Sequence, residues 1–362
     1  MSNWKTCQLG DLITFQRGHD LPKSKMQGNT YPVVGSNGII GYHNEYTTEA
    51  PSITIGRSGN VGKPFLYKGR SWSHNTSLYI REYKNVDPFF IYYLLQTLDL
   101  GNYAGGSAVP TLNRNHIHTL NITVPVDIEE QRRIASVLTV LDDKIEKNTE
   151  INENLADQIQ TIYSNEFDPT THTPSGVLAD ICSYSSDRIP VSDLSASTYF
   201  STENMQSNKM GSVDATSLPS ITQTTGCHKG DVLISNIRPY FKKIVYVTDD
   251  RCGCSTDVLC FVPKEDQYSA FLFGTLYMDR FFDYMVAGSK GTKMPRGDKQ
   301  QIMNYPVVLP DKESLDHFNG LTAPMLDQIA TNRVVSSRLA ALRDALLPKL
   351  MSGELDISAL DL

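Results

Sequence analysis

The stretch IEEQRRIASVLTVLDDKIEKNTEINENLADQIQTIYSNEF, residues 128–167, contains neither glycine nor proline. Its apolar residues recur at alternating spacings of four and three, which is the a/d pattern of a coiled coil, and Asn148 and Asn152 interrupt the apolar series. A helix of this length extends about 60 Å, which is too long for an ordinary core helix. We therefore predict that it packs lengthwise against another helix, through Ile134, Leu138, Leu141, Ile145, Asn148, Leu155 and Ile159.

A second helix of the same kind is predicted from MLDQIATNRVVSSRLAALRDALLPKLMSGEL, residues 325–355. Each helix follows a globular stretch that ends in a similar strand-like segment, IHTLNITVP at 117–125 and IMNYPVVLP at 302–310. Similarity of this kind at a long period indicates a duplicated unit. The packing residues of the second helix are Ile329, Asn332, Leu339, Leu342 and Leu346, of which the first three correspond to Ile145, Asn148 and Leu155.

The predicted fold is α+β. Two similar mixed α/β domains, residues 1–127 and 169–310, are separated by two long helices, in residues 128–168 and 311–362. We expect the helices to pair antiparallel as a coiled coil and to give the chain approximate twofold symmetry.

Matching segments carry the similarity between the two domains. PSITIGRSGNVGKPFLYKG at 51–69 predicts a hairpin with a glycine-rich turn, and DPFFIYYLLQTL at 87–98 predicts a buried helix that Asp87 caps. In the second domain KGDVLISNIRPYFKKIVYV at 229–247 takes the place of the hairpin, and SAFLFGTLYMDRFF at 269–282 takes the place of the helix.

The net formal charge is −7, but the charge is unevenly distributed. Residues 1–126 hold 11 Lys and Arg against 7 Asp and Glu, whereas residues 127–168 hold 4 against 11. The acidic side chains concentrate in the helices, so the globular domains are free to present basic faces. No apolar run approaches the roughly 18 residues of a membrane span, and the six cysteines form no paired C-x-x-C set. We therefore expect a reduced, cytoplasmic protein.

The sequence lacks the patterns of a catalytic or metal centre. GRSGNVGK at 56–63 resembles a phosphate loop, but the first glycine position of that motif falls on Arg57, and Pro64 follows the lysine. The Cys-Gly-Cys at 252–254 matches no structural zinc spacing, so buried thiols are the expected state. Asp142 lies in the middle of the predicted helix and cannot join a carboxylate cluster on one metal. We expect no catalytic residue, no metal and no cofactor.

The glycine hairpin, its counterpart in the second domain and two polar loops carry side chains suited to DNA. The loops, residues 105–115 and 288–297, occupy equivalent places in the two domains. Their Ser, Thr, Asn, Lys and Arg side chains are of the types that contact phosphates and base edges. Either loop alone reads as an ordinary solvated loop, and the equivalent placement favours a function. The candidate DNA-binding residues are Arg57, Ser58, Lys63, Lys68, Arg70, Ser107, Thr111, Asn113, Arg114, Asn236, Arg238, Lys242, Lys243, Lys290, Thr292, Lys293 and Arg296.

This arrangement of globule, helix, globule and helix resembles the specificity subunit of type I restriction–modification systems. EEQRRIASVLTVLDDKIEKN at 129–148 is similar to the central conserved region of that family, and LAALRDALLPKLMSGEL at 339–355 is similar to its C-terminal conserved region. LGDLITFQRGHDLP at 9–22 resembles the usual start of a target-recognition domain. The resemblance covers essentially the whole chain, and the second globule departs most, because its hairpin lacks the glycines of the first.

The resemblance implies a non-catalytic subunit in which each globule is a target-recognition domain for one half of a split site in double-stranded DNA. The paired helices would act as a ruler, and half-sites one helical turn apart lie about 34 Å, or 10 base pairs, from centre to centre. The helices would also dock methyltransferase subunits, in two copies, and restriction subunits where the system has them, and catalysis would belong to those subunits.

Four polar side chains on the helices have specific expected roles. Gln131, Arg132 and Arg133 are candidate contacts to a partner protein or to the DNA backbone, with a solvated helix surface as the alternative. A buried pair of Asn148 and Asn332 would fix the register of the two helices at a cost in stability.

Two other classes of function remain open from the residues alone. A scaffold protein whose helices associate with another copy predicts no sequence-selective binding to DNA. An enzyme such as a nuclease predicts metal-dependent cleavage by the chain alone, and the lack of a convergent catalytic set argues against it.

Overall fold

The computed structural model describes residues 3–105 and 110–357. The chain forms two compact units, residues 1–146 with 336–362 and residues 147–335. The two long helices, α4 (Ile128–Phe167) and α9 (Lys312–Met351), each contribute to both units. The predicted helix over 128–167 is therefore confirmed, and the second helix begins earlier than the repeat at 325. No helix of the described ranges is long and apolar enough to cross a membrane.

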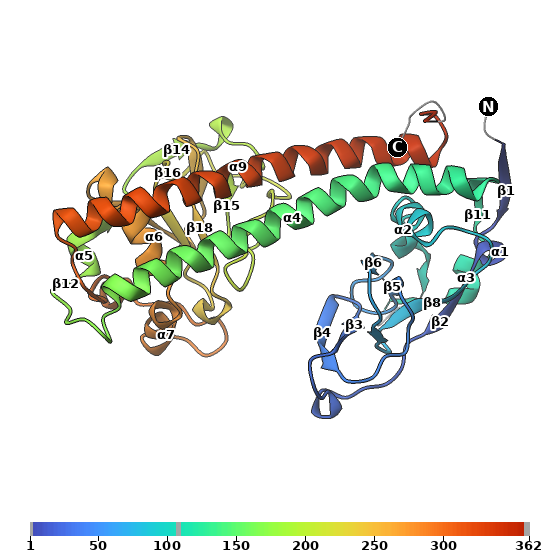
Figure 1. The fold of residues 1–362 in the computed structure, drawn as a ribbon, viewed down its shortest axis with the longest axis horizontal. Helices are drawn as coiled ribbons and strands as arrows, with labels where there is room; N and C mark the ends of the chain where they lie inside the picture. The colour runs from blue at the N-terminus through green and yellow to red at the C-terminus, as the bar shows by residue number, and fades with distance from the viewer. Residues whose placement is uncertain (1–2, 106–109, 358–362) are drawn as a thin grey trace. The chain divides into compact units, whose positions relative to one another are not determined.

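The first unit is built on an antiparallel four-stranded sheet in the order β2-β8-β5-β6, beside a three-stranded sheet in the order β4-β3-β7 (Figure 1). A separate pair joins β1 to β11, the strand that leads into α4. The strands are β1 (Trp4–Gln8), β2 (Ile13–Arg17), β3 (Tyr31–Gly35), β4 (Gly38–His43), β5 (Ser52–Gly56), β6 (Pro64–Tyr67), β7 (Trp72–Ser73), β8 (Ser77–Tyr83), β9 (Ala104–Gly105), β10 (Thr111–Leu112) and β11 (Asn121–Pro125). The short helices are α1 (Leu9–Leu12), α2 (Pro88–Gln96) and α3 (Arg114–His118).

The second unit repeats this topology. Its sheet β13-β20-β17-β18 has the same order as the first when the strands are counted along the chain, and β12 pairs with β21 as β1 pairs with β11. A second sheet has the order β14-β16-β19-β15. The strands are β12 (Gly176–Val177), β13 (Cys182–Tyr184), β14 (Arg188–Pro190), β15 (Tyr199–Phe200), β16 (Gln223–Cys227), β17 (Val232–Ser235), β18 (Ile244–Tyr246), β19 (Cys252–Cys254), β20 (Val258–Pro263) and β21 (Pro306–Val307). The short helices are α5 (Leu178–Ile181), α6 (Ser269–Tyr277), α7 (Asp279–Ala287) and α8 (Lys299–Met303).

Local sequence explains the buried helices. Asp87 accepts a hydrogen bond from the Phe90 amide at 3.0 Å, which is the predicted cap of α2. The single helix expected over 269–282 is instead two, because Met278 has extended backbone angles between α6 and α7. α6 is almost wholly buried, whereas α7 buries one face through Phe281, Phe282 and Met285, so the predicted helix differs from the structure in its continuity and in the burial of its second half.

Within each unit the segments of α4 and α9 run antiparallel and close a hydrophobic core. In the first unit, Ile134 and Leu138 share a core with Leu350. In the second unit, the core joins Ile159 to Ile329, and the rings of Tyr163 and Phe318 lie 6.2 Å apart. Leu141, Ile145, Leu155, Leu339 and Leu346 are half-buried. Leu342 is an exception, because it is 47% exposed and does not pack between the helices.

The predicted asparagine pair has a different geometry from the one expected. Asn148 and Asn332 are both buried, but the Asn332 side-chain amide donates to Asn152 Oδ1 at 2.8 Å. Asn148 Nδ2 instead donates to the backbone carbonyl of Asn332 at 3.5 Å. The antiparallel stagger places Asn332 between the two asparagines of α4, so the side-chain pair is 332 with 152.

Candidate nucleic-acid interface

In the first unit the glycine hairpin and the following polar loop meet. The Leu112 amide donates to the Arg57 carbonyl at 2.9 Å, and Ser58 forms an isolated bridge with Thr111. Gly59 and Gly62 in the hairpin turn have φ of 87° and 81°, which L side chains rarely adopt. The turn therefore depends on glycine, and it presents the basic hairpin next to the segment that carries Thr111, Asn113 and Arg114.

Two cations at this place are available to a ligand. Lys63 is exposed and lies 5.6 Å from the centre of the Phe65 ring, and Arg114 is exposed at the start of α3. Neither forms an ion pair with a carboxylate in the part of the chain that the structure describes. Arg57 is half-buried and donates to the Asn75 carbonyl at 3.5 Å.

The loop expected over 105–115 is partly ordered secondary structure. Thr111 belongs to β10, and the Asn113 side chain caps α3 by accepting from the Asn115 amide at 3.0 Å. Asn113 is therefore already used within the chain. Ser107 lies outside the described residues.

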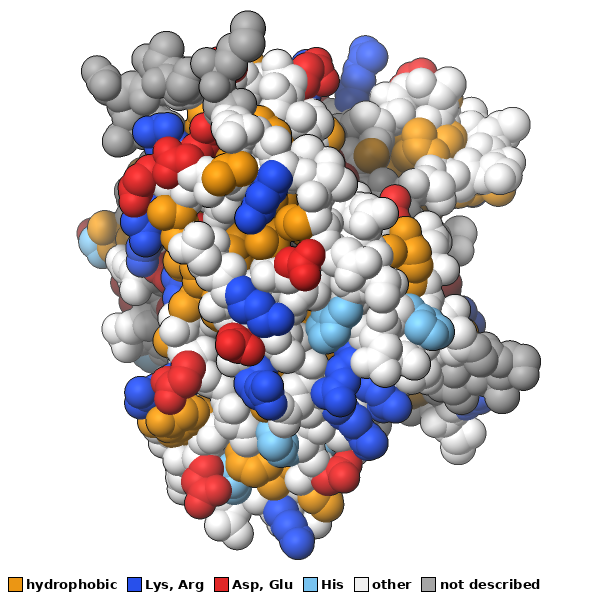
Figure 2. Space-filling model, turned by 90° about the vertical axis from the view of Figure 1, so that its right-hand side faces the viewer, with side chains coloured by type: hydrophobic (Ala, Val, Ile, Leu, Met, Phe, Trp, Pro, Cys, Tyr) orange, Lys and Arg blue, Asp and Glu red, His pale blue; other side chains and the backbone are white. Residues whose placement is uncertain are grey.

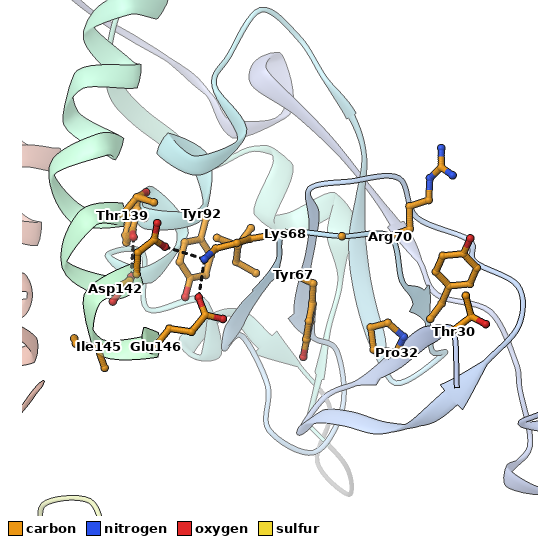
Figure 3. Close-up of a pocket in the computed structure, with 15 residues that line it drawn as sticks. Thr30, Pro32, Tyr67, Lys68, Arg70, Tyr92, Thr139, Asp142, Ile145 and Glu146 are labelled. Carbon is orange, nitrogen blue, oxygen red and sulfur yellow. Dashed lines mark hydrogen bonds and ion pairs between the residues drawn. The ribbon is translucent and has the colours of Figure 1, made fainter. Parts of the chain in front are cut away.

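Lys68 and Arg70 are engaged within the chain. Lys68 donates to Asp143 at 2.8 Å and to Glu146 at 2.6 Å, and these hydrogen bonds raise the pKa of Lys68 (Figure 3). Lys68 thus ties the hairpin to α4. Arg70 points away from this contact, binds Glu49 at 2.7 Å and lies 4.5 Å from the centre of the Tyr46 ring. Both cations are neutralised, so they are weaker candidates for phosphate contacts than Lys63 and Arg114.

A pocket of about 700 Å³ adjoins the Lys68 contact. Tyr67 and Tyr92 line it together with Asp142 of α4 (Figure 3). Asp142 accepts from the Tyr93 hydroxyl and from Arg343, both at 2.7 Å, so its charge is compensated. The pocket carries no unpaired catalytic group and belongs to the packing of the hairpin on the helix.

The second unit brings together the equivalent segments. The Arg238 amide donates to the Pro295 carbonyl at 2.8 Å, and Ile237 forms an isolated bridge with Arg296. The Gly297 amide donates to the Asn236 carbonyl at 3.3 Å. The turn after β17 is therefore joined to the loop 288–297, just as the turn after β5 is joined to β10.

Most of the candidate cations of the second unit have partners in the chain. Lys242 pairs with Asp279 at 3.1 Å, Lys290 with Asp298 at 2.6 Å and Arg296 with Asp257 at 2.8 Å. Lys243 donates to the Thr202 carbonyl at 2.6 Å, and burial lowers the pKa of its amine. These residues shape the loops and leave fewer charges for a ligand.

Three further residues of this unit remain candidates on different grounds. Thr292 and Lys293 are exposed, and Lys293 has no ion pair among the described residues. Asn236 is only 8% exposed, and its Oδ1 atom is buried without a hydrogen-bond partner in the described structure. Arg238 is half-buried, and its Nε atom is likewise buried without a hydrogen-bond partner in the described structure.

Aromatic side chains at this turn were not predicted. Tyr240 and Phe241 are 49% and 38% exposed, and their ring centres lie 4.8 Å apart in a tilted arrangement. The sequence Arg-Pro-Tyr-Phe-Lys-Lys at 238–243 carried the signal, because aromatic residues between cations in a turn are unusual on a solvated loop.

The three polar residues at the start of α4 differ in their surroundings. Gln131 is 2% exposed, accepts from the Asp87 amide at 2.9 Å and donates to the Pro125 carbonyl at 2.9 Å. It is not accessible, so the expectation that it contacts a partner is wrong. Arg132 pairs with Glu129 on the surface, and Arg133 is half-buried.

The cysteines are buried thiols as predicted. All six are free, and five of them, in the second unit, are buried. Burial raises the pKa of Cys182 and of Cys252 to about 12, which keeps both protonated at neutral pH. The described residues include no cluster of His, Cys, Asp and Glu suited to a metal ion.

Charge on the surface is mixed. Figure 2 shows Lys and Arg side chains interspersed with Asp and Glu and with uncharged polar surface. On this face, binding to a phosphate backbone would rest on a few placed cations.

Comparison with known proteins finds similarity to type I restriction–modification specificity subunits. Residues 1–156 match the sequence model of the type I restriction modification DNA specificity domain. The type I restriction enzyme EcoprrI specificity subunit of Escherichia coli is 28% identical over 149 residues, which are 40% of this chain and 37% of that protein. The type I restriction enzyme MjaIX specificity subunit of Methanocaldococcus jannaschii is 25% identical over 316 residues, which are 75% of this chain and 70% of that protein.

The fold has a counterpart among solved structures. The S subunit of a type I restriction–modification system from M. genitalium superimposes with a TM-score of 0.60 over 96% of both chains, at 17% identity. At that identity the likeness concerns the fold alone. Residues 1–156 are therefore similar to the type I restriction modification DNA specificity domain, and the chain is similar in sequence and in fold to type I specificity subunits.

Proposed function

We propose that this chain selects the DNA sequence on which a type I restriction–modification complex acts, with residues 1–127 and 169–310 as two target-recognition domains. The observation that carries the proposal is the repeated junction of a turn with a polar loop. In both units the turn after the second strand of the sheet is hydrogen-bonded to a loop that follows the buried helices. Two copies of one scaffold with different side chains at this junction suit the reading of two different half-sites.

The proposed contacts differ between the units. In the first unit, Lys63 and Arg114 are the exposed cations. Arg57, Ser58 and Thr111 lie at the junction of turn and loop and are proposed as further contacts. In the second, Thr292 and Lys293 are exposed beside the turn 238–243. Cations of this kind fix the position on the duplex through phosphates, and neighbouring polar groups read base edges.

The long helices are proposed to dock the methyltransferase subunits and to set the spacing between half-sites. Val140 of α4 and Leu342 of α9 are 65% and 47% exposed, and Ile151, Leu321 and Val334 of the same helices are each 43% exposed. A partner protein that covers them would remove this apolar surface from water. The similar proteins are named specificity subunits, and this supports a non-catalytic role for the chain, with methylation and cleavage carried out by the other subunits of the proposed complex.

A scaffold without DNA selectivity is the weaker alternative. It explains the helices, but it gives no reason for the same junction of turn and loop to recur in both units. The comparisons also favour the specificity role.

Binding measurements with matched lysine variants test the proposal. The chain is co-expressed with the methyltransferase encoded beside it, and the affinity of the complex for its target DNA is followed against salt. We expect Lys63→Ala to weaken binding and to lower the slope of log K against log salt by about one, because one phosphate contact is lost. Lys68→Ala, whose cation is paired with Asp143 and Glu146, is the control and should keep the slope. An unchanged slope for Lys63→Ala, or a complex without selectivity between target and unrelated DNA, would count against the proposal.

A further inference from the structure

The turn at residues 238–243 of the second unit has features that the proposed phosphate contacts do not explain. Tyr240 and Phe241 expose apolar ring surface at the tip of a loop. Apolar surface that stays in contact with water contributes nothing to folding stability. Their ring centres lie 4.8 Å apart, and the two rings are tilted by 53° relative to each other. The pair therefore presents one continuous apolar edge.

The backbone of this turn is strained and held in place. Arg238 and Lys242, which flank the one-turn 3-10 helix η4 (Pro239–Phe241), have φ of 50° and 51°. Left-handed backbone at residues other than glycine costs free energy and persists only where the surroundings enforce it. Here the Arg238 amide bonds to Pro295, and the Phe241 and Lys242 carbonyls accept from the amides of residues 208 and 209, all at 2.8 Å.

The turn that carries the rings also carries cations. Three of the six residues at 238–243 are cationic and none is acidic. Lys242 pairs with Asp279, which also pairs with Lys209, and Lys243 donates to the Thr202 carbonyl. Arg238 is half-buried and has no carboxylate partner among the described residues, so the apolar tip lies next to one cation that is available to a phosphate.

A pocket adjoins the turn at Phe241. It has a volume of about 550 Å³, and Phe241, Leu218 and Met294 line its apolar side. The polar side is lined by Arg238 and Lys243, by the hydroxyls of Ser201 and Thr202, and by the carboxylates of Glu203 and Asp257, of which Asp257 pairs with Arg296. Leu218 and Met294 are themselves 36% and 48% exposed, so the apolar surface extends from the rings into the pocket.

We propose that Tyr240 and Phe241 form a wedge that enters a base step of the DNA half-site read by the second unit and partly unstacks it. Apolar side chains that are inserted in this way kink the duplex, and the cost of unstacking depends on the step, so the wedge contributes to sequence selection without hydrogen bonds to bases. This inference rests on the proposed function. The first unit has the glycine turn 56–63 at the equivalent place, with no aromatic residue in the turn, so the wedge belongs to one half-site only.

The experiment uses the complex of the full chain with its co-expressed methyltransferase and a duplex that contains the target, with 2-aminopurine placed at each adenine position in turn. Because a methyltransferase itself flips its target adenines, those positions are set aside, and at the remaining positions we expect the wild-type complex to raise the fluorescence at one step of one half-site. Tyr240→Ala/Phe241→Ala should abolish that rise and weaken binding by about 5- to 150-fold, the range for loss of a stacked base. Val286→Ala, which shortens an exposed apolar side chain on α7 of the same unit, is the control. It should keep both the rise in fluorescence and the affinity for DNA.

Several outcomes separate the inference from the proposed function. A wild-type complex that does not prefer its target contradicts the proposed function. Selective wild-type binding with the same fluorescence and affinity in the double variant contradicts only the wedge. Loss of the methyltransferase from the double variant, seen by mass photometry, would show that the tip docks protein and would also overturn the wedge. If the double variant does not fold, Tyr240→Ala alone, at the more exposed ring, is measured with the same expectations.

Discussion

At the scale of single residues, Asn332 shows how the antiparallel helices fix their register. Its side-chain amide donates to Asn152, and its side-chain oxygen accepts from Gln328, each at 2.8 Å. Both polar ends are therefore satisfied in a place that is only 7% exposed. Spacing along the sequence predicted that asparagines occupy the seam, but not which pair meets, because the stagger between two helices is not encoded in either repeat alone.

Replacing Asn148 and Asn332 by leucine should stabilise the chain and relax its register. Two more leucines at the seam bury apolar surface, and the unfolding free energy in urea is expected to rise by on the order of 1–2 kcal/mol. Without the polar contacts, the helices can shift, so methylation by the complex should accept a spacer one base pair longer or shorter. A variant that keeps strict selection of one spacer would contradict the register role.

Asp168, directly after α4, is a carboxylate whose ion pair makes the stability of the second unit depend on pH. Burial raises the pKa of its carboxyl, but hydrogen bonds from Thr170 and the ion pair with Arg280 outweigh burial, so the pKa lies below its usual value. A depressed carboxylate contributes stability that is fully present above its unfolded pKa of about 3.9 and is lost as the pH falls through the folded pKa.

Arg280→Met tests this contact. We expect the unfolding free energy at pH 7 to fall by roughly 2–3 kcal/mol, because a buried carboxylate loses its cation. The difference from wild type should shrink as the pH is lowered below 4, where protonation removes the charge in both proteins. Arg251→Met, at an exposed arginine of the same unit, is the control for the loss of a positive charge. A difference that stays constant down to pH 2 would rule out the ion pair as its cause.

At the scale of elements, the sequence predicted the hairpin and the buried helix of the first unit, because neighbouring residues determine both. The hairpin over 51–69 appears as β5 and β6, and the apolar run after Asp87 appears as α2 with its cap. The sequence did not predict the pairing of the first strand or the break between α6 and α7. The strand Trp4–Gln8 pairs with a strand more than a hundred residues away, and the break between α6 and α7 falls at Met278, where the sequence 269–282 has no proline to mark it.

Gln131 was predicted to contact a partner protein or DNA, but it is buried within the first unit. Its position between two charged helical residues suggested exposure, but it joins α4 to the cap of α2 and to the end of β11. Gln131→Leu should lower the unfolding free energy by about 1–3 kcal/mol, since a buried amide and a buried carbonyl lose their partner. Arg132→Ala, at a side chain that is 55% exposed, should change it by less than about 0.5 kcal/mol. A Gln131→Leu chain of wild-type stability that fails to bind its partners would restore the interface role.

At the scale of the whole molecule, one topology occurs twice with different junctions. The order of the four-stranded sheets and the pairing of the first strand with the strand before the long helix are the same in both units. The repeat of the sequence predicted this duplication, because the two long helices diverged least. The residues that touch DNA could not be chosen from the sequence, since many candidate cations, such as Lys68 and Lys242, turned out to be paired with carboxylates far away in the chain.

The central claim is that this chain determines which DNA sequence its complex modifies. The most direct measurement is genome-wide profiling of DNA methylation in the source cell, with and without the gene for this chain. The account predicts that deletion removes methylation at one split motif, two short half-sites around a fixed gap, and that the gene returned on a plasmid restores it. An unchanged methylation profile in cells shown to express the chain and its methyltransferase would contradict the claim.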